Sequence, residues 1–368
     1  MIFKIITYTF YKRERKKPKM KKFLLQIGVI CIIYFIITNP NEAMQYTTNA
    51  MDMCFGIIVP TLFPFFVCSG LLIYSGFCNT LSKLFAFCMR PLFLVSPAGA
   101  SAFVIGIVSG YPLGAITAGE LYKNNYITKT EAQRLLAFCN NSGPLFILCS
   151  VGLAMYSSLK YGVALYVCHI LASVCVGILF RFYRRNDYIA PKTIMTSDEK
   201  SIGTIFSVSV NNAVSNMLTV CGTVVFFSVV SSLIVSHLPL NTTLYAIFVS
   251  LSEFVSGTNL ISSLDMDMGM KLILTAFVVG FAGLSVHLQV MAAVSKYELS
   301  LKPYIIGKLL HGVLSALFML IYLKINPITT AVFNASIDRG FAASASYFVV
   351  LVIMELIMLL SLMAIKHK

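Results

Sequence analysis

Charged residues are scarce in this chain of 368 residues: Asp, Glu, Lys and Arg together make up 11% of it, whereas 58% is hydrophobic. A soluble domain carries about a quarter charged residues, so this composition leaves too little polar surface for a water-soluble protein. Apolar runs recur along nearly the whole length. The sequence therefore predicts an all-α polytopic membrane protein that lies in a lipid bilayer.

Motifs of enzyme and cofactor chemistry are missing as well. The sequence has no Walker loop, no His-Glu-x-x-His and no nucleophile elbow, so we expect neither an enzyme nor an ATP-driven pump, and no cofactor. The ten cysteines form no Cys-x-x-Cys pair and mostly lie in apolar runs. Buried cysteine behaves as a small hydrophobe, and this interpretation is favoured over a disulfide or a metal site.

The net charge of +14 does not indicate nucleic-acid binding. Basic residues gather at the ends of apolar runs, in Lys12–Lys22, Arg181–Lys192 and Lys366–Lys368. This is the pattern of positive-inside topology signals, which places the first two clusters in the cytoplasm. The predicted organisation is a basic cytoplasmic N-terminus (1–22, with Met20 as an alternative start), a first transmembrane helix (23–42), repeat one (43–182), a cytoplasmic linker (183–200), repeat two (201–325), and a C-terminal loop and transmembrane helix (326–368).

Local signals predict further helices between these boundaries. Thr128 and Glu131 form a capping box that starts an amphipathic helix running to Phe138. Proline and embedded charge indicate where other segments end or leave the membrane. The remaining expectations are a first span at Phe23–Thr38, an amphipathic helix at Ala43–Val59 stopped by Pro60, an interfacial or re-entrant segment at Thr80–Val95, spans at Tyr161–Phe182, Pro303–Leu323 and Tyr347–Ile365, and long helical stretches at Ile202–Val235 and Thr242–Leu264.

Two apolar stretches contain helix breaks. Ala98–Tyr122 is interrupted at Gly110–Gly114, and Lys271–Val294 is interrupted at Gly280–His287. A break frees backbone donors and acceptors that lipid cannot satisfy, so they must face protein or a watery cavity. The N-terminus of a half-helix can then hold an anionic group. A glycine kink that only lets helices pack closely is the alternative.

Short matches indicate an internal duplication. Phe103-Val-Ile-Gly matches Phe277-Val-Val-Gly 174 positions later, and weaker matches occur at offsets of 174, 172 and 161. Because the N-terminus and the linker are both expected in the cytoplasm, the two repeats should be inverted. Inverted repeats with interrupted helices are typical of transporters with a site near the bilayer midplane.

Polar residues near the breaks are candidates for that site. Asn140-Asn-Ser-Gly-Pro144 offers amides and a hydroxyl, with an interfacial turn as the alternative. Glu253 lies in an apolar run, where a carboxylate indicates proton or cation coupling unless it is a structural partner. Beyond the second break, Ser285, His287 and Gln289 alternate, and extended backbone would place all three on one side.

Three stretches resemble the YlbJ-type sporulation integral membrane proteins, which carry the nucleoside-recognition "Gate" domain of concentrative nucleoside transporters: Ser109-Gly-Tyr-Pro-Leu-Gly-Ala115, Leu135-Leu-Ala-Phe-Cys-Asn-Asn-Ser-Gly-Pro-Leu-Phe-Ile147 and Gly283-Leu-Ser-Val-His-Leu-Gln-Val290. The resemblance covers roughly residues 20–325. Family members often have Glu-x-Thr-x-Gly before the second break; Glu253 matches this stretch, but Val255 occupies the position of its threonine. The resemblance implies a Gate-like fold and transport of dipicolinic acid, a planar dianion, across the outer forespore membrane during late sporulation.

The sequence and the resemblance together give one set of expected substrate-binding residues. A nucleoside or other small-molecule carrier is the second hypothesis, and a non-transporting sporulation scaffold is the third; the oligomeric state stays open. The expected substrate-binding residues are Ser109, Gly110, Tyr111, Pro112, Gly114, Asn140, Asn141, Ser142, Gly143, Glu253, Thr258, Asn259, Ser285, His287 and Gln289.

Overall fold

The computed structural model describes residues 23, 26–75, 77–184, 201–295 and 297–327, and the elements it contains in these ranges are all helical. The predicted C-terminal span at Tyr347–Ile365 and most of the linker lie outside the described residues. The helices are Gln26–Thr38, α2 (Pro40–Met53), α3 (Val59–Tyr74), α4 (Phe77–Cys88), α5 (Ala100–Ser109), α6 (Leu113–Lys123), α7 (Lys129–Phe138), α8 (Leu159–Phe180), α9 (Ile202–Ser236), α10 (Thr242–Ser252), α11 (Phe254–Ser263), α12 (Met268–Phe281), α13 (Gly283–Ser295) and α14 (Lys302–Ile325), with π-helical η1 (Cys54–Ile58), η2 (Met89–Phe93) and η4 (Phe146–Met155) and the 3-10 turn η3 (Pro97–Gly99).

The N-terminal helices form a bent arm. Helix Gln26–Thr38 ends where the sequence predicts, and Pro40 starts the next helix after a 100° bend. The prediction that Pro60 stops a helix is wrong, because η1 runs directly into α3. Proline removes one hydrogen bond and crowds the preceding turn, and the wider π-helical turn just before Pro60 accommodates both effects.

The long apolar helices provide the membrane spans. Within the described part, α8, α9, α12 with α13, and α14 are long and apolar enough to cross a bilayer, and two sharply bent pairs raise the number from four to as many as six. One of these pairs, Lys83–Phe93 with Pro97–Ser109, bends by 111°. This is the region expected to be interfacial or re-entrant.

Two helical hairpins lie at equivalent places in a structural repeat. In each, two helices of ten or eleven residues pack against one another across a short break: α5 with α6 around Gly110, and α10 with α11 around Glu253. Each hairpin is followed by an interrupted helix, α7–η4 or α12–α13, and then by a long span, α8 or α14. The order hairpin, interrupted helix and long span therefore occurs twice.

Equivalent positions of the two repeats are 143 residues apart in the sequence. Glu253 follows Gly110 by 143 positions, Gly283 follows Asn140 by 143, and the start of α14 follows the start of α8 by 143. The offset of 174 taken from the sequence is wrong, because it pairs an arm of a hairpin with α12. The α5–α6 break reverses the chain, whereas α12 and α13 continue as one 28-residue span.

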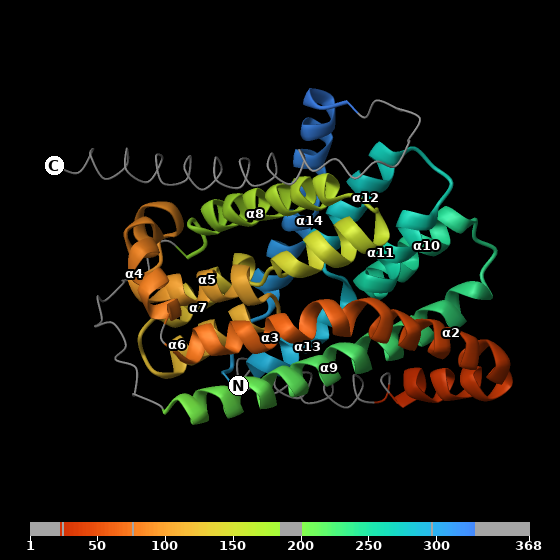
Figure 1. Ribbon diagram of the computed structural model, residues 1–368, viewed down its shortest axis with the longest axis horizontal. Helices are drawn as coiled ribbons and strands as arrows, with labels where there is room; N and C mark the ends of the chain where they lie inside the picture. The colour runs from red at the N-terminus through yellow and green to blue at the C-terminus, as the bar shows by residue number, and fades with distance from the viewer. Residues whose placement is uncertain (1–22, 24–25, 76, 185–200, 296, 328–368) are drawn as a thin grey trace, which may run out of the picture.

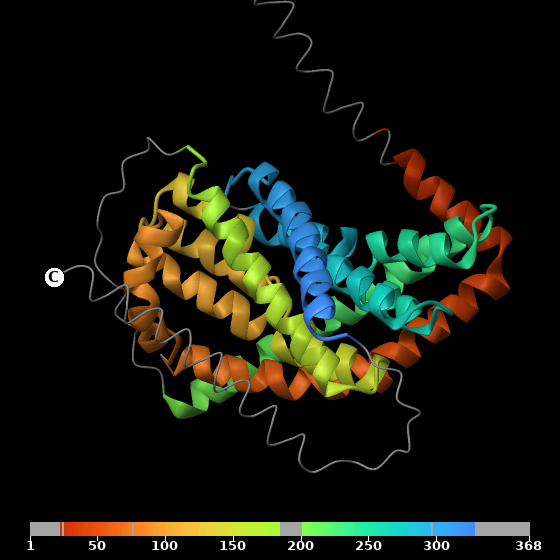
Figure 2. The ribbon, with the colours of Figure 1, turned by 90° about the horizontal axis from the view of Figure 1, so that it is seen from above.

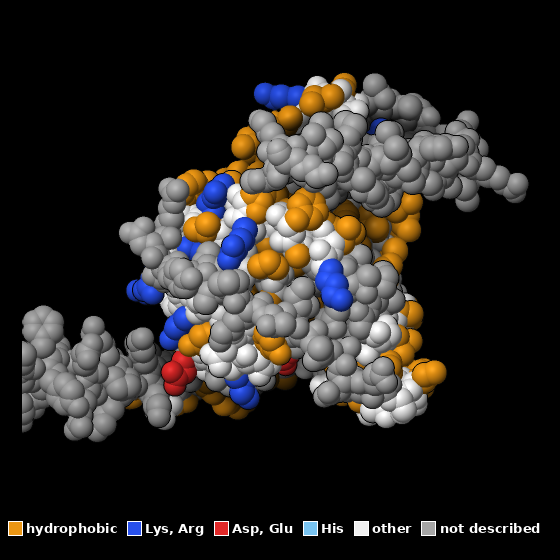
Figure 3. Space-filling view, turned by 90° about the vertical axis from the view of Figure 1, so that its left-hand side faces the viewer, with side chains coloured by type: hydrophobic (Ala, Val, Ile, Leu, Met, Phe, Trp, Pro, Cys, Tyr) orange, Lys and Arg blue, Asp and Glu red, His pale blue; other side chains and the backbone are white. Residues whose placement is uncertain are grey.

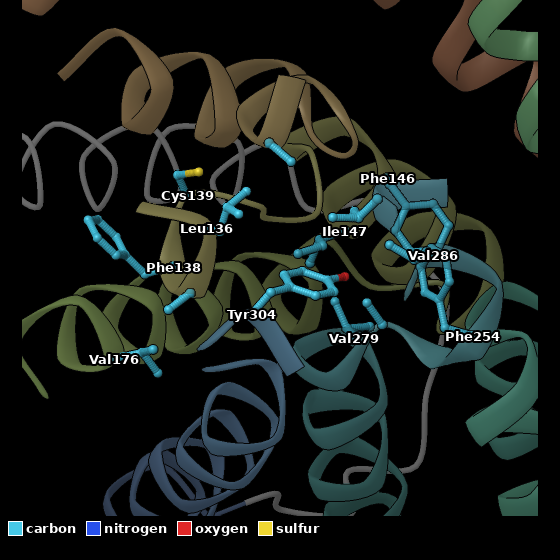
Figure 4. Close-up of a cluster of buried hydrophobic side chains, with 14 of the residues drawn as sticks. Leu136, Phe138, Cys139, Phe146, Ile147, Val176, Phe254, Val279, Val286 and Tyr304 are labelled. Atoms are coloured by element: carbon cyan, nitrogen blue, oxygen red, sulfur yellow. The ribbon is translucent and has the colours of Figure 1, made fainter. Parts of the chain in front are cut away.

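The two repeats lie on opposite sides of the molecule. In both ribbon views, α4 to α7 lie at the left and α10 to α12 at the right (Figures 1 and 2), and Figure 2 shows α8 and α14 passing between the two groups. Seen from the left-hand end, Lys and Arg side chains are scattered among hydrophobic ones (Figure 3). One buried hydrophobic cluster joins the repeats, and a close-up shows α7 and η4 side chains beside those of α11 to α14 (Figure 4).

Candidate functional site

The tip of the first hairpin is a backbone turn that requires glycine. Gly110 has φ +77° and ψ −174°, a conformation open essentially only to glycine. A Cβ at this position would lie 2.9 Å from the Gly143 nitrogen, so the tip packs backbone to backbone on the α7–η4 break. Tyr111 precedes a cis proline, and Pro112 is the N-cap of α6.

The tip of the second hairpin is Glu253 itself. The sequence placed this residue inside one apolar segment, but its backbone is extended and separates α10 from α11. Its carboxylate oxygens accept hydrogen bonds from the backbone N–H groups of Val255 (3.1 Å) and Ser256 (2.6 Å). The carboxylate therefore caps α11, whose positive N-terminus compensates part of the negative charge.

The second tip also packs on the break that follows it. Ala282 has φ +76° and Gly283 has φ +68°, which ends α12 and starts α13. A Cβ at Gly283 would lie 3.2 Å from the Phe254 nitrogen. The contacts of Gly110 with Gly143 and of Phe254 with Gly283 thus join equivalent segments of the two repeats, although the residues in contact are not themselves 143 positions apart. In both repeats, the tip of the hairpin and the break of the next helix meet through main-chain atoms.

A small cavity lies where both tips and both breaks converge. Its volume is about 50 Å³, which is room for a few water molecules. Drug-sized ligands occupy sites of roughly 300–1,000 Å³, so this conformation is closed around the cavity. Side chains of α3 and α9 complete the wall opposite the tips. The lining residues are Ile58, Leu62, Phe65, Phe66, Ser109, Gly110, Tyr111, Ser142, Gly143, Phe146, Val220, Val224, Glu253, Phe254, Val255, Val286 and Gln289.

Aromatic rings surround the polar groups of the cavity. The ring of Phe254 meets the ring of Tyr111 at a centroid distance of 5.5 Å and that of Phe146 at 5.1 Å, both edge to face. Phe146, Phe254 and Val286 lie side by side in the close-up (Figure 4). Such edge-to-face contacts add to the stability that burial of the rings provides. The cavity is thus an aromatic-walled space with a few polar groups.

Seven of the fifteen expected residues line this cavity: Ser109, Gly110, Tyr111, Ser142, Gly143, Glu253 and Gln289. The three segments expected to converge, at residues 109–110, 140–142 and 285–289, each contribute at least one lining residue. The other eight do not line it: Pro112, Gly114, Asn140, Asn141, Thr258, Asn259, Ser285 and His287.

The non-lining residues have other contacts that explain their positions. A Cβ at Gly114 would collide with the Cys139 carbonyl oxygen, so this glycine serves close packing. The Asn141 amide donates to the Phe138 carbonyl (3.0 Å), and the Thr258 hydroxyl donates to the Phe254 carbonyl (2.6 Å). Both side chains are therefore engaged by the backbone of their own segment.

Helix formation places Ser285, His287 and Gln289, which follow the second break, on different sides of α13. The residues of α13 are helical from Gly283 onward, so the three side chains do not share the one side that extended backbone would give them. His287 Nδ1 lies 3.0 Å from the Tyr304 hydroxyl, away from the cavity, whereas the Gln289 amide donates to the Thr223 hydroxyl (2.7 Å) on α9. Ser285 is buried beside Glu253.

Several buried polar atoms around the site lack hydrogen-bond partners within the described residues. They are the hydroxyls of Ser109, Tyr111 and Ser285, both side-chain polar atoms of Asn140, and Oδ1 of Asn141. A buried polar group without a partner costs about 1–3 kcal/mol. Their concentration at the two tips and breaks is typical of a site that meets water or a polar ligand.

Sequence reasoning missed a buried basic cluster behind the first break. The Lys308 ammonium donates to the Asn140 carbonyl oxygen (3.2 Å) and lies 3.3 Å from His311 Nδ1. His311 Nε2 reaches the His169 carbonyl oxygen (2.8 Å), and His169 Nε2 accepts from the Ser142 N–H (3.1 Å). The available signal was an ionisable residue inside an apolar run, the same signal that selected Glu253.

No metal site was found in the part of the chain that the structure describes, since no group of three or more His, Cys, Asp or Glu side chains there could hold an ion.

Comparisons with known proteins identify a similar curated sequence and a similar solved structure. No family model matches the chain. It is 28% identical over 348 residues, covering 85% of both chains, to the sporulation integral membrane protein YlbJ of Bacillus subtilis (strain 168). A solved structure of a CNTnw variant in an intermediate state is similar at a TM-score of 0.48 and 14% identity, over 80% of this chain and 86% of the other.

Proposed function

We propose that this chain, which is similar to the sporulation integral membrane protein YlbJ, is a secondary transporter that moves dipicolinate across the outer forespore membrane. The observation that carries the proposal is the convergence of two hairpin tips and two helix breaks on one cavity. Interrupted backbone at membrane depth is tolerated only where it is buried in protein or lines a cavity. Paired interruptions at repeat-related positions favour a transport site.

The chemistry of the cavity fits a planar aromatic solute with polar edges. The rings of Tyr111, Phe146 and Phe254 offer faces and edges to a pyridine ring. The Ser109 hydroxyl, which has no hydrogen-bond partner among the described residues, and the Tyr111 hydroxyl beside it offer donors to a carboxylate. A pyridine dicarboxylate is larger than about 50 Å³, so binding requires the cavity to open.

Uptake by the purified protein in proteoliposomes tests this proposal. We expect accumulation of radiolabelled dipicolinate above the level of protein-free vesicles, with competition by unlabelled dipicolinate and little competition by nucleosides. Uptake of uridine or adenosine in preference to dipicolinate would identify a nucleoside carrier instead. Uptake of neither solute by correctly inserted protein would favour the non-transporting scaffold.

A further inference from the structure

Lys308 is a buried lysine without an acidic partner. It lies in α14, its side chain is 1% exposed, and no ion pair joins it to a carboxylate among the described residues. Its ammonium instead contacts the Asn140 carbonyl oxygen, His311 Nδ1 and the face of Tyr111, whose ring centroid is 5.8 Å away. A buried ionisable residue in a membrane is costly and by default marks a functional site.

The hydrogen bonds around Lys308 place the positive charge of this cluster on its ammonium. The backbone N–H of Ser142 donates to His169 Nε2, so that nitrogen carries no proton. The nitrogen Nε2 of His311 faces a carbonyl oxygen and must donate, which leaves Nδ1 to accept from Lys308. With Lys308 as the donor to His311 Nδ1, both imidazoles are neutral and the positive charge of the cluster lies on the Lys308 ammonium.

This charge lies directly behind the cavity. Asn140 begins the break whose Ser142 and Gly143 line the cavity, and the Tyr111 ring separates Lys308 from the cavity interior. The carboxylate of Glu253 faces the same cavity, but it is turned onto the amides of α11. Among the described residues the ammonium has no carboxylate as a hydrogen-bond partner, so it contributes positive potential at the first tip.

We propose that Lys308 is the residue that makes this cavity select an anion over a neutral solute of the same shape. The inference rests on the proposed transport function and adds its specificity determinant. A carboxylate on the far side of the Tyr111 ring would lie roughly 9–10 Å from the ammonium. At an effective dielectric constant of about 20, this separation corresponds to roughly fifteen- to twentyfold in affinity for a carboxylate placed there.

Binding measured with matched ligands separates this role from a structural one. The probes are dipicolinate and its uncharged diamide, pyridine-2,6-dicarboxamide, titrated into purified protein. We expect Lys308→Met to weaken dipicolinate binding at least tenfold and to change diamide binding less than threefold. Lys271→Met is the matched control, because Lys271 also donates to a backbone carbonyl, that of Ser262 (3.0 Å), but lies outside the cavity. Equal losses for both ligands, or an unchanged preference for the dianion, would overturn the proposal.

Two further measurements do not depend on the folding of Lys308→Met. In the unmodified protein, affinity should fall about tenfold from dipicolinate to picolinate and again from picolinate to picolinamide, with little effect of salt because the charge is buried. In Lys308→Ala, added ethylammonium should restore dipicolinate binding by filling the vacated position. Equal affinities for dipicolinate, picolinate and picolinamide would overturn the role of Lys308. If the unmodified protein binds none of these solutes, the transport proposal is refuted, and this inference with it.

Discussion

Replacing Glu253 by Gln tests whether this residue couples transport or only caps a helix. Two amide hydrogen bonds, of 3.1 Å and 2.6 Å, end on its carboxylate. Glutamine keeps one oxygen that can accept, so the change removes one bond and the negative charge. Loss of a helix cap costs about 1 kcal/mol, and hydrogen bonds to charged groups are worth about 1.5–3 kcal/mol. We therefore expect a loss of about 1–2 kcal/mol at this tip, too small to prevent insertion.

The transport effect should be larger than the structural one. If the Glu253 carboxylate takes up a proton or a cation with the solute, Glu253→Gln will still exchange labelled for unlabelled solute but will not concentrate it. Proteoliposomes with an imposed cation or proton gradient measure the two activities separately. The expected accumulation ratio falls to about one, while exchange stays within severalfold of that of the unmodified protein.

Asp267→Asn is the matched control for this experiment. Asp267 caps α12 by accepting from the Met270 N–H (3.1 Å), so the same acid-to-amide change occurs at a helix cap away from the cavity. We expect normal accumulation in this variant. If Glu253→Gln also accumulates solute normally, the coupling argument is refuted and Glu253 is a capping residue alone.

Three further changes test the site and its supports. Gly110→Ala should lower the free energy of unfolding of the purified protein by about 1–3 kcal/mol, because alanine is strained at the positive φ of this position. Gly222→Ala on α9, where a Cβ meets nothing within 4 Å, should be neutral or stabilising. Gln289→Ala should weaken apparent solute affinity roughly ten- to a hundredfold, and Ser262→Ala, outside the cavity, should change little; unchanged affinity in both would remove Gln289 from the site. Arg134→Met should lower the free energy of unfolding by about 1.5–3 kcal/mol, because it removes the charged donor that contacts three partly buried carbonyl oxygens at 2.6–2.9 Å, and a melting temperature near that of the unmodified protein would contradict this.

Features with a local cause could be predicted from the sequence. The capping box at Thr128 and Glu131 forms with both hydrogen bonds, because its partners are three residues apart. The break at Gly110 and the long helix α9 follow equally from nearby residues. The basic clusters and the apolar runs identify a membrane protein before any tertiary contact is known.

Features that depend on tertiary contacts could not be predicted in this way. The break at Glu253 contains no glycine or proline, since Ser252 and Phe254 flank it, and it exists because a carboxylate caps the second arm. The helix α7 was expected to be amphipathic, but its residues from Thr130 to Phe138 are all buried, because Arg134 finds backbone acceptors in distant segments. The offset between the two repeats could not be found from the sequence, because apolar sequence matches itself at many offsets.

The contacts around the closed cavity indicate which parts separate when it opens. Each hairpin tip meets its neighbouring break through main-chain atoms at glycine, with no side chain between them that could change rotamer. The opposite wall, formed by α3 and α9, meets the cavity through side chains such as Phe65, Phe66 and Val224. Packed backbone contacts are bistable rather than continuously deformable, so we infer that each tip and its break move as one unit. Opening therefore occurs between these units and the side-chain wall of α3 and α9, where rotamer changes alone enlarge the space.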